Sequence, residues 1–265
     1  MPNHIALRID GDIAHVTLDR PEKLNSLSID MLQELVRVAG ELRRNRDIRA
    51  VVLSGNGDVF SSGIDVNALS GGVSALRYFL PIPFRGTNLF QEACWAWRRV
   101  PVPVVAVVHG RCYGAAIQLA LAADFRFATP DCEFSVMEAK WGLVPDMSGS
   151  ATLAEVVGID RAKLLTMTAD VVDGLTAERY GLITATAADP HAAALDLITR
   201  IGKRSPDAVA GAKRLLNAAF SSSPLHAFAI ERRTQLRLLV GRNSAVARKA
   251  GMQKVLPKFG PRQLG

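Results

Sequence analysis

The sequence predicts an α/β fold whose C-terminal part is purely helical. Short apolar strands alternate with helical segments as far as about residue 188, which favours a largely parallel sheet covered by helices. From residue 189 onward only helical patterns follow. These two observations predict an α/β core over 1–188 and a helical region over 189–265, and a chain of 265 residues is long enough for such an organisation.

The N-terminal elements follow from local patterns. Segments 4–10 and 13–19 alternate in period two around Gly11-Asp12, which predicts a β-hairpin. After a turn, Ser28 can cap a helix that ends near Arg46, because apolar residues recur at helical spacing. A short apolar strand is then expected over 48–53.

The later elements continue the alternation of strands and helices. Residues 73–99 are expected to be helical in their second half, after an interruption at Pro81–Pro83. The apolar run 102–108 predicts a buried strand that leads directly into a turn of small residues and then a helix. Proline and serine breaks divide the C-terminal region into helices over 189–204, 206–220, 224–241 and 244–256.

Composition excludes several classes of protein. A hydrophobic content of 49% with 22% charged residues is that of an ordinary globular chain, and no apolar run is long enough for a membrane span. The net charge of +7 comes from scattered basic residues without a nucleic-acid module, so nucleic acid is the least favoured partner. The odd number of widely spaced cysteines predicts free thiols and a cytoplasmic location, and no metal cluster is expected.

The stretch 109–146 carries the strongest functional signal. The helix expected after the strand 102–108 starts with Gly114-Ala-Ala, so no bulky side chain covers its first backbone N–H groups. Such unobstructed amides can bind an anion. Two carboxylates, Glu138 and Asp146, follow further along the chain, which points to proton chemistry beside a stabilised negative charge.

A second loop of small residues, Phe60–Asp65, follows the strand 48–53. One amide from this loop and one near Ala115 would make an oxyanion hole, and loss of one such donor typically costs about 10²–10³ in rate. Taken alone the loop is an ordinary turn, and small residues at 110–116 equally permit close packing of helix on strand.

The polar side chains each have two interpretations. Glu138 is either a partly desolvated base or a surface residue paired with Lys140. Asp146 is either a cap for the next helix or a functional carboxylate, acting as a second acid/base group or as a nucleophile. Gln118 lies one helical turn beyond Gly114, and its neutral amide can orient a substrate or a water but cannot take a proton.

Together these residues resemble the crotonase superfamily of enoyl-CoA hydratases and isomerases. The similarity covers nearly the whole chain and is carried by the order and spacing of three motifs. They are Asp19–Leu27, Val51–Gly55 with Phe60–Asp65, and Val108–Ala116 continuing to Asp124.

The resemblance implies a spiral of ββα units with a helical C-terminal trimerisation region, hence a homotrimer or a dimer of trimers. It implies an acyl-CoA substrate and no further cofactor. The amides of Ser62 and Ala115 would hold the thioester oxygen as an enolate. Loop 63–67, with Gly63, Ile64 and Asp65, would line the nucleotide and pantetheine path, and Lys258 would meet CoA phosphates.

The chain also departs from the family pattern. Hydratases use two glutamates, and Gln118 stands at the position of the first, while Glu138 retains the second. Asp146 stands where hydratases usually have glycine and dienoyl-CoA isomerases have aspartate, although those isomerases carry another aspartate in place of Gln118. Ala115 and Ala116 replace the usual glycines.

The sequence therefore favours double-bond isomerisation in fatty-acid metabolism. Glu138 and Asp146 would exchange protons with the acyl chain, and Gln118 would orient that chain or a water. Hydration of 2-enoyl-CoA is the close alternative. A non-catalytic acyl-CoA-binding homologue is a third hypothesis, because Gln118 and the two alanines weaken the match to an active site.

Overall fold

A six-stranded sheet forms the centre of the computed structural model, which describes residues 4–65 and 77–264. β1 and β2 form the expected antiparallel hairpin, and the remaining neighbours in the order β1-β2-β3-β4-β6-β8 pair in parallel. A separate parallel pair joins β5 to β7. The strands are β1 (Ile5–Asp10), β2 (Ile13–Leu18), β3 (Ala50–Gly55), β4 (Val104–Val108), β5 (Arg111–Tyr113), β6 (Phe125–Ala128), β7 (Glu133–Ser135) and β8 (Ala185–Thr186).

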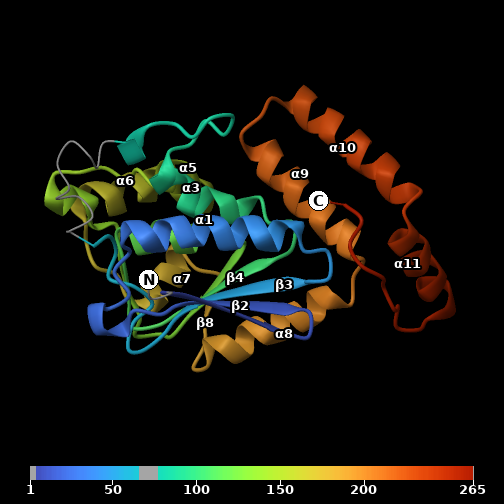
Figure 1. Cartoon of the computed structure of the whole chain (residues 1–265), viewed down its shortest axis with the longest axis horizontal. Helices are drawn as coiled ribbons and strands as arrows, with labels where there is room; N and C mark the ends of the chain where they lie inside the picture. Colours follow the sequence, from blue (N-terminus) through green and yellow to red (C-terminus); the bar gives the residue numbers. More distant parts are fainter. Residues whose placement is uncertain (1–3, 66–76, 265) are drawn as a thin grey trace.

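Helices cover both faces of this sheet (Figure 1). On one side lie α1 (Ile29–Arg44) and α3 (Leu89–Arg98), and on the other lies α8 (Pro190–Gly202). The other elements are the short helices η1 (Pro21–Lys23) and η3 (Met137–Trp141), and the helices α4 (Ala115–Leu121), α5 (Gly149–Val157), α6 (Ile159–Thr168), α7 (Gly174–Tyr180), α9 (Pro206–Phe220), α10 (Pro224–Leu239) and α11 (Arg242–Gln253).

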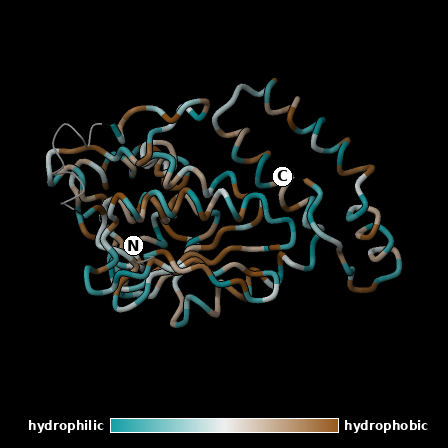
Figure 2. Tube along the Cα trace, viewed as in Figure 1, coloured by the Kyte–Doolittle hydropathy of each residue, from teal (hydrophilic) through white to brown (hydrophobic). Residues whose placement is uncertain are grey.

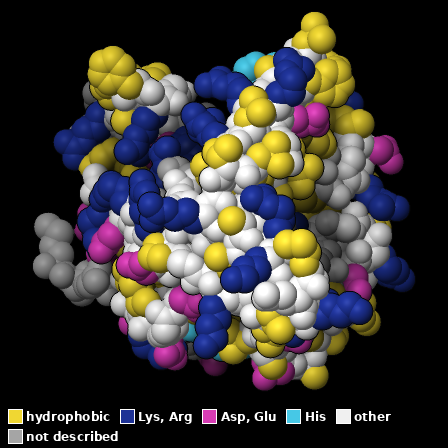
Figure 3. Space-filling view, turned by 90° about the vertical axis from the view of Figure 1, so that its right-hand side faces the viewer, with side chains coloured by type: hydrophobic (Ala, Val, Ile, Leu, Met, Phe, Trp, Pro, Cys, Tyr) yellow, Lys and Arg dark blue, Asp and Glu magenta, His cyan; other side chains and the backbone are white. Residues whose placement is uncertain are grey.

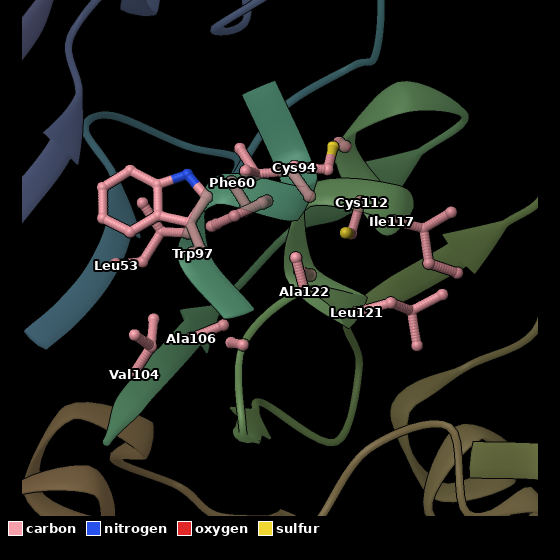
Figure 4. Close-up of a cluster of buried hydrophobic side chains, with 14 of the residues drawn as sticks. Leu53, Phe60, Cys94, Trp97, Val104, Ala106, Cys112, Ile117, Leu121 and Ala122 are labelled. Carbon is pink, nitrogen blue, oxygen red and sulfur yellow. The ribbon is translucent and has the colours of Figure 1, made fainter. Parts of the chain in front are cut away.

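The apolar strands supply two cores because successive side chains point to opposite faces of a sheet. In β3, Val51 and Leu53 belong to the larger core, whereas Ala50 and Val52 pack with α8 on the other face. Figure 4 shows part of the larger core, in which Trp97 lies near β-strand and loop residues. Figure 2 shows that the central strands are mostly hydrophobic. Burial on both faces explains why these strands are continuous apolar runs.

Most predicted elements are confirmed. The Ser28 hydroxyl caps α1 by accepting from the Met31 amide at 3.3 Å, and the four C-terminal helices match their predicted positions within a few residues. The beginning of the predicted segment 73–99, up to residue 76, lies outside the described residues. Helix α5 is the helix expected after Asp146, whereas α6 and α7 are additional, since these helices of 10 and 7 residues bury few side chains each and leave little periodicity in the sequence.

Helices α9–α11 form an arm that extends from the body (Figure 1). Lys213 of α9 anchors it through an ion pair with Asp124 at 2.7 Å. The chain end then returns to the body, where Arg49 donates to the Gly260 carbonyl at 2.9 Å and Arg262 to the Asn45 carbonyl at 2.8 Å. All these contacts lie at the amino ends of the parallel strands.

The arm leaves much apolar surface uncovered. In α10 only Ala227 is buried, while Leu225 and Leu236 are 78% and 65% exposed. A groove of about 680 Å³ is lined by residues of α9 and α10. On the face that carries the arm, hydrophobic side chains lie among lysines and arginines (Figure 3). Within the described residues no helix has the length and apolar character needed to cross a membrane. The boundary at residue 188 stays a prediction.

Candidate active site

Two loops meet at the carboxyl ends of β3 and β4, where the sequence placed the candidate site. The Phe60 amide donates to the His109 carbonyl at 2.9 Å, and the Ser61 amide donates to the Arg111 carbonyl at 3.1 Å. In return the Tyr113 amide donates to the Ser61 carbonyl at 3.3 Å. The segments after the two strands are therefore held together by their backbones.

Gly63 allows the backbones of the two loops to approach each other closely. Its φ of 104° lies in the region that favours glycine, and a Cβ there would lie 2.8 Å from the Tyr113 carbonyl oxygen. The same Cβ position is 3.7 Å from the Ala115 nitrogen. The backbones at 63 and 115, which are far apart in sequence, are therefore neighbours.

The structure contradicts one predicted donor, the amide of Ser62. This amide donates to the Leu24 carbonyl at 2.9 Å, so its hydrogen is already used within the protein. The physical reason is that the turn at 20–25 lies against the loop, which the sequence could not show. Ser62 cannot supply an amide to a thioester oxygen in this geometry.

The neighbouring amide of Ile64 takes its place. The Gly63 amide donates to the Ser61 hydroxyl at 3.2 Å and the Asp65 amide to the Leu27 carbonyl at 2.9 Å. Between them, the Ile64 amide has no acceptor among the described residues. The sequence predicted Ile64 only as a residue lining the nucleotide and pantetheine path. It could not predict the free amide, because the register that pairs Leu27 with Ile64 is set by tertiary contacts.

Ala115 supplies a second amide at the first residue of α4. It follows Gly114, which has a φ of 52° and no side-chain cap. The Gly114 amide is taken by the Ser135 carbonyl at 2.9 Å, whereas the Ala115 amide has no acceptor in the described part of the chain. The Ala115 methyl group is buried, with 5% of the residue exposed. The amides of Ile64 and Ala115 thus lie on adjacent backbones without protein partners.

Glu138 lies in the short helix η3 and is only 8% exposed. Its Oε1 accepts a hydrogen bond from Gln118 Nε2 at 2.5 Å, and its buried Oε2 has no partner among the described residues. Burial raises the pKa of Glu138, and the nearby charge of Asp146 adds to the rise, against hydrogen bonds from its own backbone and Gln118. Glu138 is therefore a desolvated carboxyl group rather than a surface partner of Lys140.

Asp146 lies between η3 and α5 and is exposed to solvent. Crowding by surrounding atoms nevertheless raises its pKa. Its negative charge helps to raise the pKa of Glu138. It also helps to raise the pKa of the Cys94 thiol, where burial is the larger cause. The carboxylate therefore lies within electrostatic reach of Glu138. It does not cap α5, since the N-cap position belongs to Ser148.

Gln118 connects these parts. Besides its bond to Glu138, its Oε1 accepts from the backbone amides of Met147 and Gly149 at 2.8 and 2.9 Å. The residue is 1% exposed. Its carbonyl oxygen is consequently occupied by protein groups, contrary to the expectation that Gln118 orients an acyl chain or a water.

The residues expected to bind the CoA part of the substrate lie in two separate places. Gly63, Ile64 and Asp65 lie beside the unpartnered amides, and Arg20 holds Asp65 through an ion pair at 2.7 Å. Residues 66 and 67 lie outside the described part. Lys258 lies two residues from Gly260, which contacts Arg49 at the amino end of β3. The structure therefore places Lys258 at the opposite end of the strands from this chain's own site.

Known proteins resemble this chain over most of its length. The profile of the family Enoyl-CoA hydratase/isomerase matches residues 8–259. A relative in Arabidopsis thaliana, "Delta(3,5)-Delta(2,4)-dienoyl-CoA isomerase, peroxisomal", is 31% identical over 217 residues, which cover 78% of each chain. "Probable enoyl-CoA hydratase echA8" of Mycobacterium leprae is 29% identical over 95% of this chain and 96% of the relative. The crystal structure of an enoyl-CoA hydratase from Polaromonas sp. JS666 superposes with a TM-score of 0.85 at 28% identity, covering 97% of this chain and 99% of that chain.

Proposed function

The chain belongs to the enoyl-CoA hydratase/isomerase family, and from that premise we propose that it moves a carbon–carbon double bond along an enoyl-CoA. The CoA thioester is the substrate, and the reaction needs no further cofactor. The same family membership supports a crotonase fold and a role in acyl-CoA metabolism.

In this proposal the amides of Ile64 and Ala115 bind the thioester oxygen. Removal of a proton from the carbon next to the thioester spreads negative charge onto that oxygen. Preorganised N–H donors stabilise this charge more than they stabilise the neutral thioester, which lowers the barrier. The absence of protein acceptors for both amides in the described residues supports this role.

Glu138 and Asp146 would then move the proton. One ionised carboxylate takes a proton from the α-carbon, and the electron pair of that C–H bond enters the conjugated enolate. A carboxylic acid returns a proton to a carbon further along the acyl chain as the double bond shifts. The raised pKa values of Glu138 and Asp146 favour such exchange, because a carboxyl group titrating nearer neutrality can serve as base or acid.

The observation that carries the proposal is the bond from Gln118 to Glu138. Where hydratases of the family have a second glutamate to activate water, this chain has a neutral amide already engaged by protein groups. A water there would lack the second carboxylate, whereas proton transfer needs only Glu138 and Asp146. Hydration is the second candidate, because Glu138 is retained and relatives are named as hydratases.

The test offers the purified enzyme 3-enoyl-CoA, 3,5-dienoyl-CoA and 2-enoyl-CoA separately and identifies the products. We expect fast isomerisation that falls by about 10²–10⁴-fold in Glu138→Gln and is also reduced in Asp146→Asn. Fast hydration of 2-enoyl-CoA that needs Glu138 but ignores Asp146→Asn would contradict the proposal. Tight binding of CoA esters with no turnover would instead indicate a non-catalytic homologue.

We also propose that the arm mediates assembly into a homotrimer or a dimer of trimers. The exposed apolar side chains of α9 and α10 support this, since no other described residue of the chain covers them. Lys258 could then contact CoA phosphates only in the site of a neighbouring subunit. A cytoplasmic location stays a prediction.

A further inference from the structure

We propose that Gln118 is a positioning residue that holds Glu138 and the turn after Asp146 in one geometry and thereby favours isomerisation over hydration. This inference rests on the proposed function and specifies how the site selects its reaction. It assigns Gln118 no contact with the substrate.

The contacts of Gln118 join three segments. From α4 its Nε2 reaches Glu138 in η3 at 2.5 Å, and its Oε1 accepts from Met147 and Gly149 at 2.8 and 2.9 Å. The side chain is buried, so little water competes for these bonds. One amide group therefore restrains both the base and the turn that follows Asp146.

Gly149 is shaped to this contact. A Cβ at position 149 would lie 2.5 Å from Gln118 Oε1 and 2.8 Å from its Cδ and Cγ. Ser148, just before it, adopts a left-handed conformation with a φ of 73°, which turns the chain into α5. The backbone consequently approaches the amide more closely than any residue with a side chain would allow.

Only an amide can make all these contacts without added charge. Gln118 donates to a carboxylate with one end and accepts from two backbone amides with the other. An ionised glutamate at 118 could accept from Met147 and Gly149 but could not donate to Glu138. Two carboxylates at that distance would repel, and Glu138 would be free to rotate.

The arrangement also decides which oxygen of Glu138 reacts. Oε1 is engaged by Gln118, whereas Oε2 is buried and has no partner in the described residues. Oε2 is therefore the oxygen left to exchange a proton with the substrate. Because the partner of Oε1 is neutral, position 118 supplies no carboxylate that could polarise a water beside it.

The first experiment compares Gln118→Glu with the unchanged protein. We expect the kcat of isomerisation to fall by about 10²-fold, since small displacements of a catalytic group have effects of that size. The acidic limb of the kcat/KM profile should move to higher pH, because a like charge raises the pKa of Glu138. The ratio of hydration to isomerisation should rise. An unchanged product ratio together with an unchanged pH profile would overturn the proposal.

The second experiment disrupts the contact between Gln118 and Gly149 by changing the glycine. Gly149→Ala displaces the Gln118 amide, and we expect kcat to fall while KM changes little. Gly202→Ala, at the end of α8, is the matched control because a Cβ there meets no atom within 4 Å. Equal kcat values for Gly149→Ala and Gly202→Ala would overturn the proposal, even if Gln118→Glu folds poorly.

The two proposals can fail separately. If the unchanged protein hydrates 2-enoyl-CoA and does not isomerise, the proposed function fails. Positioning by Gln118 then still predicts the shifted acidic limb in Gln118→Glu and the lower kcat in Gly149→Ala, measured on hydration. If the unchanged protein isomerises and neither variant shows its effect, only the role of Gln118 fails.

Discussion

The two ends of the parallel strands are stabilised in different ways. At the carboxyl ends, backbone groups hold the loops to one another, and Gly63 and Gly149 permit approaches that a Cβ would block. At the amino ends, side chains hold the arm to the body, chiefly Lys213 with Asp124 and Arg262 with the Asn45 carbonyl.

In the two proposals above, this difference separates the chemistry from the assembly. Backbone contacts have few degrees of freedom, so the amides of Ile64 and Ala115 are fixed before any substrate arrives. Long side chains tolerate variation in the segments they join, and α10 buries only Ala227 against its own chain. The carboxyl ends are suited to stabilising charge, and the amino ends carry a surface suited to a neighbouring subunit.

The largest effect is expected from a substitution that breaks the ion pair between the arm and the body. Lys213→Met leaves Asp124 without its cation, and loss of one partner from a buried pair typically costs about 3–5 kcal/mol. Lys213 also donates to the carbonyls of Trp97 and Val102. We expect a lower free energy of unfolding in urea. The double variant Lys213→Met/Asp124→Asn should recover part of the loss, and a cost equal to the sum of the single changes would argue against coupling.

A second prediction compares glycines from the two regions. In Gly63→Ala the new Cβ clashes with the Tyr113 carbonyl and displaces the Ile64 amide, so turnover should fall by about 10²–10³-fold. Gly251→Ala, in α11, places its Cβ in open space and should leave turnover unchanged. Steady-state kinetics on both variants measure the contrast. Similar rates in the two would mean that the backbone at Gly63 does not position the donor.

A third prediction concerns the surface of the arm. Leu236→Lys puts a charge on an exposed apolar face of α10, and we expect subunit association to weaken by about 10-fold or more. Sedimentation velocity across a range of protein concentrations measures the change. The same substitution at an exposed helix position of the body, Leu164→Lys in α6, tests whether the effect belongs to the arm. An unchanged association constant for Leu236→Lys would place the interface elsewhere.

The smallest effect concerns the stability of the site itself. Because the pKa of Glu138 is raised in the fold, its contribution to stability is present below the unfolded pKa and is lost as pH rises through the folded pKa. Glu138→Gln removes that burial cost at neutral pH while keeping an acceptor for Gln118. We expect the variant to have a higher Tm than the unchanged protein at pH 7, and the difference in Tm to shrink toward pH 4. Calorimetry across this pH range measures it. A lower Tm at pH 7 would contradict a desolvated, ionised Glu138.

Local patterns predicted much of this molecule. The hairpin around Gly11, the Ser28 cap and the four C-terminal helices depend on neighbours in sequence, and the structure agrees with them. The resemblance carried by Phe60–Asp65 and Val108–Ala116 indicated the family, and the family profile confirms it. Helices α6 and α7 escaped prediction because they are short and bury few residues.

The sequence by itself determined the α/β class, the family and the residues that could carry chemistry. Only the tertiary structure decided which of their atoms are available. The amide of Ser62 is used by Leu24 while that of Ile64 is not, the amide of Gln118 is engaged between Glu138 and Gly149, and Lys258 lies at the far end of the strands. Periodicity and caps act between near neighbours, whereas a hydrogen-bond partner depends on which distant segments the fold brings together.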